Sequence, residues 1–341
     1  MALSIEHSSL MKKILYTLAA LLFCTAASAD NSTKTYTVTV AYDGTKAVVS
    51  IPEAITDYVS CPSGESSHVK LLQTSTTEKN PGEIIYSLSG QSDNGEFYLT
   101  GEYKATLQLN GLTLANPDSS AVHIKDGKRI KVSMAANTVN TLSDGVADST
   151  SKGCFHCKGH TEFAGKGTLN VSSSFSHAIY SKEYVEVKNC TLNITSAKKD
   201  GIHCQEYFLM NSGTLTIKGA EDDAIQVELK DSVATGQTKD HEDENSGNFY
   251  MNGGTLTISE IGGYCVKADG SIMFSSGTRN FDTNNIKDHA TTGINPVVSR
   301  HSDNRQYYYD LNGRLMPNDA VLPRGIYIVK EGDKARKIVV K

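Results

Sequence analysis

Three aspartates suggest the first chemistry in this chain. Asp200 and Asp223 lie 23 residues apart, each two positions before an isoleucine, and Asp222 adjoins the second. If the chain repeats with that step, the two carboxylates stack about 5 Å apart and repel by about 3 kcal/mol at an effective dielectric near 20. A raised pKa, a lysine such as Lys198 or Lys199, or a cation would offset this repulsion. Calcium accepts several oxygens at variable angles, so we predict a calcium site at these aspartates; two solvated turn residues are the alternative.

A second set of residues recurs at one position of the same repeat. Six segments share a small residue, an apolar one, a polar one, and a small or apolar one, and side chains alternate along a strand. We expect the apolar members to point inward: Val122, Phe155, Ile179, Ile202, Ile225 and Val266. We expect the polar members to form an external, ligand-binding ladder: His123, His156, Tyr180, His203, Gln226 and Lys267.

The length of this ladder matches a polymeric ligand. At about 4.8 Å per coil it spans about 25 to 35 Å, which would hold several sugar units. The alternative is that any exposed face of such a fold must be polar.

Lys267 is the one residue that suggests catalysis. In a β-eliminating polysaccharide lyase, calcium binds the uronate carboxylate and a neutral lysine removes the acidified C5 proton. Lys267 lies one repeat step beyond Gln226, on the aspartate face. Its pKa would have to fall well below about 10.4 for this role. We therefore assign no catalytic residue and keep a lyase that uses Lys267 as an alternative.

A fixed step in the sequence decides how these residues are positioned. The segment beginning Gly167-Thr168-Leu169 recurs around Thr191, Thr214, Thr255 and, weakly, Thr278, at intervals of 23, 23, 41 and 23 residues. The long interval is one step plus an insertion of 18, which we expect to arch beside the predicted metal site. Alternating segments rich in Val, Ile, Thr and Tyr predict strands, and repeats of this length must stack to bury a core. We predict an all-β fold, a parallel β-helix with about 23 residues per rung.

The sequence divides into five parts. The first has the basic start, short apolar run and small residues of a secretory signal peptide, with Met11 as a possible second start. The second reads as irregular β sequence that caps the open end. The predicted parts are 1–29 signal peptide, 30–94 N-terminal cap, 95–281 β-helix, 282–305 linker and 306–341 C-terminal β unit.

Charge and hydropathy argue against two classes of partner. The formal net charge is −5, and losing Lys12, Lys13 and Glu6 with the leader takes it to −6. This mild acidity argues against nucleic acid, which requires a basic face. No apolar run beyond the leader approaches the ~20 residues that cross a bilayer. We expect a monomer.

The cysteines are expected in the core or at corners. Cys157 and Cys204 occupy the same repeat position two rungs apart, about 9.6 Å, whereas bridged Cα atoms lie within about 7 Å. Cys154-x-x-Cys157 alone is a weak metal or redox signal. Six cysteines follow the leader: Cys61, Cys154, Cys157, Cys190, Cys204 and Cys265.

The combination of motifs resembles a family of secreted carbohydrate-binding proteins. Members are right-handed parallel β-helices, related in architecture to calcium-dependent pectate lyases and regarded as binders of acidic plant polysaccharides. The resemblance covers roughly residues 35–281 and implies calcium near Asp200, Asp222 and Asp223. It implies nothing for the 18-residue insertion or the histidines of the ladder. The segments that carry it are 102–112, 140–145, 165–169, 199–202 and 222–225.

The C-terminal residues resemble a second known element. Tyr-Asp-Leu-Asn-Gly-Arg from Tyr309, then Gly-Ile-Tyr-Ile-Val from Gly325 and a basic β end, is similar to the sorting segments of bacteria that export through the type IX pathway. This resemblance implies a secreted or cell-surface location. The whole chain thus predicts a secreted or surface-exposed binder of acidic polysaccharide with calcium. The alternatives are a pectate-type lyase and a non-catalytic adhesion or spacer solenoid.

Overall fold

The described part of the chain consists of β-strands and connecting turns. A computed structural model describes residues 35–77, 81–145, 151–232, 244–289, 306–310, 316, 322–331 and 334–340. These residues contain two short 3-10 turns, η1 (Glu53–Ile55) and η2 (Lys230–Ser232), and no α-helix. The predicted signal peptide and most of the predicted linker lie outside the described residues.

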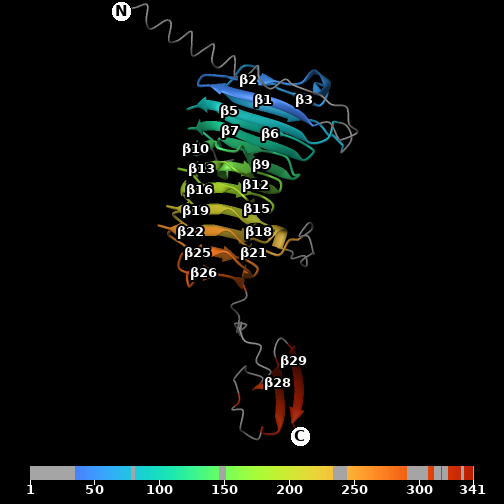
Figure 1. Cartoon of the computed structure of the whole chain (residues 1–341), viewed down its shortest axis with the longest axis vertical. Coiled ribbons are helices and arrows are strands. Elements are labelled where there is room, and N and C mark those ends of the chain that lie inside the picture. The colour runs from blue at the N-terminus through green and yellow to red at the C-terminus, as the bar shows by residue number, and fades with distance from the viewer. Residues whose placement is uncertain are drawn as a thin grey trace, which may run out of the picture.

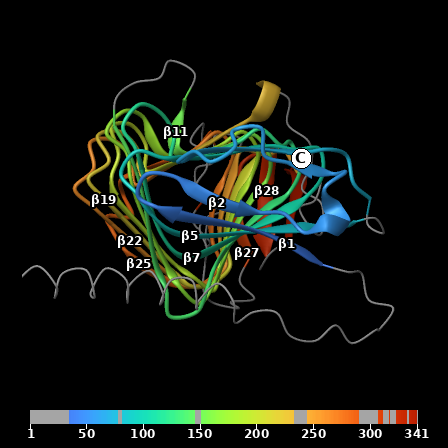
Figure 2. The same ribbon diagram turned by 90° about the horizontal axis from the view of Figure 1, so that it is seen from above.

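From β8 to β25 each coil of the solenoid contributes three strands, one to each of three faces (Figures 1 and 2). A strand on one face pairs in parallel with the equivalent strands of the coils before and after it, as β17 does with β14 and β20. The first face, a single sheet, contains β4 (His68–Gln73), β6 (Glu96–Thr100), β8 (Val122–Ile124), β11 (Gly153–Cys157), β14 (His177–Ser181), β17 (Ile202–Gln205), β20 (Ile225–Glu228), β23 (Val266–Ala268) and β26 (Ile286–Lys287).

The other two faces belong to one larger sheet. They meet at β7 (Ala105–Asn116), whose first half pairs with β9 and whose second half pairs with β10. The second face contains β9 (Ile130–Met134), β12 (Thr161–Gly165), β15 (Val185–Lys188), β18 (Tyr207–Met210), β21 (Asn248–Met251) and β24 (Ile272–Phe274). The third contains β10 (Val139–Asp144), β13 (Thr168–Ser172), β16 (Thr191–Ser196), β19 (Thr214–Lys218), β22 (Thr255–Ser259) and β25 (Thr278–Asn280).

The observed register confirms the predicted fold and its repeat. On the third face, Thr168 pairs with Thr191, which pairs with Thr214, then Thr255, then Thr278. The 18-residue insertion falls between β20 and β21, at the corner between the first and second faces. The strands on either side of it keep their register, so one repeat step is one full coil.

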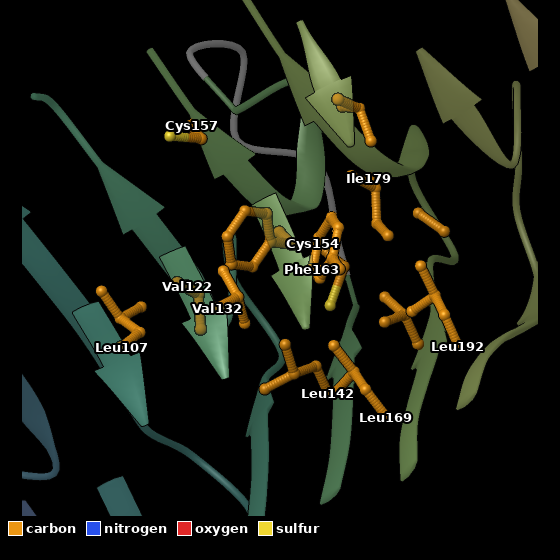
Figure 3. Packing of buried hydrophobic residues seen from close by; sticks show 14 of the residues in the cluster. Leu107, Val122, Val132, Leu142, Cys154, Cys157, Phe163, Leu169, Ile179 and Leu192 are labelled. Carbon is orange, nitrogen blue, oxygen red and sulfur yellow. The ribbon is translucent and has the colours of Figure 1, made fainter. Parts of the chain in front are cut away.

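The core fills the space that the three faces enclose. The six residues predicted to point inward on the first face pair one with the next and are fully buried. Figure 3 shows Val122 and Ile179 of this face lying toward Phe163 of the second face and Leu169 of the third. Alternation along each strand produces this arrangement, because every second side chain faces the interior.

The N-terminal residues continue the same sheets. β1 (Tyr36–Asp43) pairs in parallel with β5 (Ile84–Ser92), and β5 with β7. β2 (Ala47–Ser50) and β3 (Val59–Ser60) pair antiparallel with β1 and β4, which closes the first coil. Gly90, in β5, has φ +83°, and a Cβ there would lie 2.0 Å from the carbonyl oxygen of Tyr42.

The C-terminal unit is a separate antiparallel sheet. It contains β27 (Gln306–Tyr309), β28 (Gly325–Glu331) and β29 (Lys334–Val340). None of its described strands pairs with the solenoid sheets. A search of the described residues finds no helix with the length and hydropathy to span a membrane.

The six cysteines of the described residues are unpaired, and five of them are buried. On the first face, Cys157 and Cys204 are separated by Ser181, as the repeat register predicts. Burial raises the pKa of Cys157 and of Cys190 to about 12. These thiols therefore stay protonated at neutral pH and act as small core side chains.

Truncating one inward residue tests this core. Ile179 is fully buried between Phe155 and Ile202 of the adjacent coils. We expect Ile179→Ala to lower the free energy of unfolding by about 2–5 kcal/mol, because a cavity remains where the side chain was. Denaturant unfolding followed by circular dichroism measures this. The exposed Leu72 gives the matched control, and an equal loss in Leu72→Ala would contradict the assigned core.

Candidate functional site

The outward residues of the first face form one unbroken column. His123, His156, Tyr180, His203, Gln226 and Lys267 pair one with the next, coil by coil. The same register continues to positions that the sequence analysis did not assign: Tyr98 and Lys70 precede His123, and Lys287 follows Lys267. We call these nine residues the outward column. Its eight steps of about 4.8 Å span about 38 Å.

Ring stacking makes the column more buried than the expected external ladder. The His123 and His156 rings stack with centroids 4.4 Å apart, and those of Tyr180 and His203 stack at 5.3 Å. Between these pairs, His156 meets Tyr180 edge-on at 5.2 Å. His123, Tyr180 and His203 are consequently only 8%, 5% and 8% exposed. From Tyr98 to His203 the column is a continuous run of rings in contact.

Lysines flank the rings of this surface. The Nζ atoms of Lys70 and Lys125 lie 5.9 and 5.7 Å from the Tyr98 ring centroid. Lys152 Nζ lies 5.0 Å from the Tyr180 ring centroid and donates a 3.4 Å hydrogen bond to the Tyr180 hydroxyl. All three lysines are exposed, so their charges are available to an anionic ligand.

Asp200 is a buried carboxylate held by two histidines. Its Oδ2 lies 3.0 Å from His203 Nδ1 and 3.1 Å from His177 Nδ1, and its Oδ1 accepts the backbone N–H of Asp223 at 3.0 Å. Burial alone would raise the pKa of Asp200, but the hydrogen bonds and charges of the two imidazoles hold it well below its usual range. Asp200 therefore remains ionised.

His177 is a further residue of the candidate site that the sequence analysis did not assign. It occupies the same repeat position as Asp200 and Asp223, because Ile179, Ile202 and Ile225 pair in register and each lies two residues further on. Extending the aspartate column by one coil in the sequence would have found it.

Asp223 is held by a backbone donor and a lysine. Its Oδ1 accepts the Tyr264 N–H at 2.7 Å, and its Oδ2 lies 3.1 Å from Lys267 Nζ. Exposed Asp222 has a raised pKa, from partial burial and from the charges of Asp223 and Asp200. Each of these three aspartates presents one oxygen within 4.8 Å of the others. The structure thus brings the predicted carboxylates together.

Lys267 and the histidines, and not Lys198, offset the carboxylate repulsion. Lys198 pairs instead with Glu221 at 2.5 Å. Burial alone would lower the pKa of Lys267, but its hydrogen bond to Asp223 and the charges of the three aspartates raise it. A raised pKa is the opposite of what a neutral proton-abstracting lysine needs.

The described ends of the 18-residue insertion lie away from the aspartates. Lys230 Nζ lies 2.9 Å from Glu183 Oε1 and 2.8 Å from Glu206 Oε1, and His160 Nε2 contacts the other oxygens of the same two carboxylates at 3.0 and 3.2 Å. Glu183 and Glu206 follow their first-face strands, whereas Asp223 precedes its strand. The described residues of the insertion therefore lie where the first-face strands end, whereas the aspartates lie where these strands begin. Residues 233–243 lie outside the described part.

The partly buried His156 gives a pH-dependent prediction. Burial, with smaller effects from His123 and Lys152, lowers its pKa to about 3, whereas an unfolded histidine titrates near about 6.5. Because the unfolded chain then binds the proton more readily, stability falls as the pH drops below about 6.5 and continues to fall toward about pH 3. We expect His156→Gln to remove about 1–2 kcal/mol of the stability that the native chain loses between about pH 7.5 and about pH 5.

Denaturant unfolding at the two pH values measures this difference. His289→Gln, at an exposed position, is the matched control. An unchanged pH dependence in His156→Gln would show that this imidazole is protonated in the folded chain.

Comparison with known proteins agrees with this fold. A relative from Acetivibrio thermocellus, described as a carbohydrate-binding domain-containing protein, is 25% identical over 104 residues, which are 28% of this chain and 36% of the relative. The match therefore spans about a third of that relative's length. The solved structure of a polysaccharide lyase-like protein from C. thermocellum, a gadolinium derivative, superposes with a TM-score of 0.53 at 17% identity. It covers 74% of this chain and 99% of that one, which shows a shared fold.

A family profile also matches more than half of the chain. The profile of the family described as "Carbohydrate-binding domain-containing protein" matches residues 73–309. That range contains most of the outward column, the three aspartates and their histidine and lysine partners. The chain belongs to this family of carbohydrate-binding domain-containing proteins.

Proposed function

We propose that the chain is a secreted or surface-exposed protein that binds an acidic polysaccharide along the outward column, with calcium at the neighbouring aspartates. The observation that carries this proposal is the unbroken register of aromatic, basic and amide side chains along about 38 Å of one face. The tyrosine and histidine rings stack on one another, so a bound sugar chain would meet their edges and the polar atoms beside them. A face that is already ordered binds a long chain without losing conformational freedom of its own.

The lysines support an acidic ligand. Lys70, Lys125 and Lys152 lie along the column, and Lys267 and Lys287 continue it. They lie in two groups, separated by the coils of Tyr180, His203 and Gln226, so uronate carboxylates toward each end of a bound chain would meet ammonium groups. Hydrogen bonds between charged partners are stronger than neutral ones, so an acidic polymer gains more from this face than a neutral glucan does.

The aspartate set fits calcium in donor type. Asp200, Asp222 and Asp223 offer three converging carboxylates, and calcium takes six to eight oxygens in flexible geometry. The sugar carboxylate and water would supply the remaining ligands. Asp222 is the most available of the three, because Asp200 already meets two histidines and Asp223 already meets Lys267. When bound, calcium would add positive charge where the uronate meets the face.

Two other functions remain as alternatives with distinct tests. A lyase would need Lys267 in its neutral form, and the raised pKa of Lys267 disfavours this. A spacer solenoid would need no ligand on its outward column.

The proposed location outside the cell follows from the signal-peptide pattern of residues 1–29 and the sorting-like tail. We propose that the chain acts as a monomer.

Binding measurements with two exposed lysines test the proposed function. We expect the Lys125→Ala, Lys152→Ala double variant to bind polygalacturonate about tenfold more weakly, a loss of about 1.4 kcal/mol, because two ammonium groups are removed from the column. Affinity electrophoresis or calorimetry, in calcium and in chelator, measures this. Lys166→Ala, exposed between β12 and β13, is the matched control.

Other outcomes select the alternatives. A chain that binds neither uronic acid polymers nor neutral glucans would be a spacer. An ultraviolet-absorbing unsaturated product that disappears in Lys267→Ala would identify a lyase.

A further inference from the structure

One cluster on the first face has a donor set unlike that of the aspartates. His177, Asp200 and His203 are all buried, at 9%, 2% and 8% exposure. Their ligand atoms, two imidazole nitrogens and a carboxylate oxygen, lie within 4.8 Å of one another. Both histidines approach the same oxygen, Asp200 Oδ2, through Nδ1, at 3.1 and 3.0 Å.

These separations suit ligands of one small cation. Zinc binds imidazole nitrogen and carboxylate oxygen at about 2.0–2.2 Å, which places two tetrahedral ligands about 3.3 Å apart. Asp200 approaches His177 Nδ1 twice, with its backbone nitrogen at 3.3 Å and its carboxylate Oδ2 at 3.1 Å. An ion bound to Nδ1 and Oδ2 would take the place of a proton between them.

The surroundings hold these ligands in position. The second ring nitrogen of His203, Nε2, lies 3.3 Å from Glu228 Oε2, and Gln226 Nε2 donates to the other oxygen of that carboxylate at 2.6 Å. A carboxylate on the far nitrogen is the usual support of a metal-ligating histidine. Asp200 Oδ1 is occupied by the Asp223 N–H, which leaves Oδ2 for an ion.

We propose that His177, Asp200 and His203 bind a divalent transition-metal ion of the zinc class, beside the outward column. Imidazole ligands suit zinc, copper, nickel and related ions, whereas calcium and magnesium prefer oxygen. Three protein ligands leave a fourth position for water or a sugar hydroxyl. The site shares Asp200 with the aspartate set, but it requires neither calcium nor a polysaccharide.

The other histidine–carboxylate cluster does not share this character. In the group of His160, Glu183 and Glu206, Lys230 already bridges both carboxylates. That ammonium group supplies the positive charge that an ion would bring. This makes His160 a suitable control, because it is a histidine between carboxylates outside the proposed site.

Metal titration of the chelator-treated full chain tests the proposal. We expect zinc, in calorimetry without calcium, to bind with a stoichiometry of one. His177→Ala and His203→Ala should each weaken binding at least tenfold, and Glu228→Gln should weaken it about tenfold through the lost support of His203. His160→Ala and Asp222→Asn should bind zinc as the native chain does.

Cobalt(II) provides a second readout that needs no variant of a buried residue. Bound to the native chain, it should broaden the ring proton signals of His177 and His203 in NMR spectra and leave those of exposed His289 unchanged. The proposal is overturned by any of three results: no stoichiometric zinc binding, binding that survives both histidine substitutions, or binding lost in Asp222→Asn, which would assign the ion to the aspartate set. Failure of polysaccharide binding would leave these results unaffected.

Discussion

The constraint on which this structure depends is the parallel hydrogen bonding between coils. Each strand pairs with the strand one coil before and one coil after, so equivalent residues lie directly above one another about 4.8 Å apart. Because side chains alternate, a slip of one residue would move a whole inward column to the surface. The buried Val, Ile and Phe of the first face therefore fix the register. The outward column is placed by the same bonds and needs no packing of its own to stay aligned.

Stacking of like residues creates an electrostatic problem that the chain solves with neighbouring columns. Asp200 and Asp223 are equivalent residues of successive coils, both almost fully buried. Asp200 meets His177 from the preceding coil and His203 from its own strand, and Asp223 meets Lys267 from the following coil. A buried carboxylate without such partners would be costly. These contacts make the aspartates a fixed part of the face, and they also gather nitrogen and oxygen donors at one place.

The sequence was sufficient to predict what depends only on register. The inward column, the outward column from His123 to Lys267 and the threonine pairing of the third face all follow from the 23-residue step. The second face was not predicted, because outward positions there, such as Leu209 and Tyr250, are apolar and buried and so hide the alternation. The sequence also could not predict that the rings stack, or that Lys267 and not Lys198 pairs with a carboxylate of the aspartate set. Both depend on the directions of side chains in neighbouring coils.

The 18-residue insertion shows why such a fold can vary its surface without losing its core. The insertion interrupts the step between β20 and β21, yet Gln226 still pairs with Lys267 and Leu215 with Leu256 on either side of it. Strand pairing within each face therefore does not depend on the length of the corner that joins two faces. Outward residues likewise take no part in the core, because the inward residues next to them in sequence form its packing. Residues that bind a ligand can thus change one coil at a time, while the inward columns keep every remaining position in register.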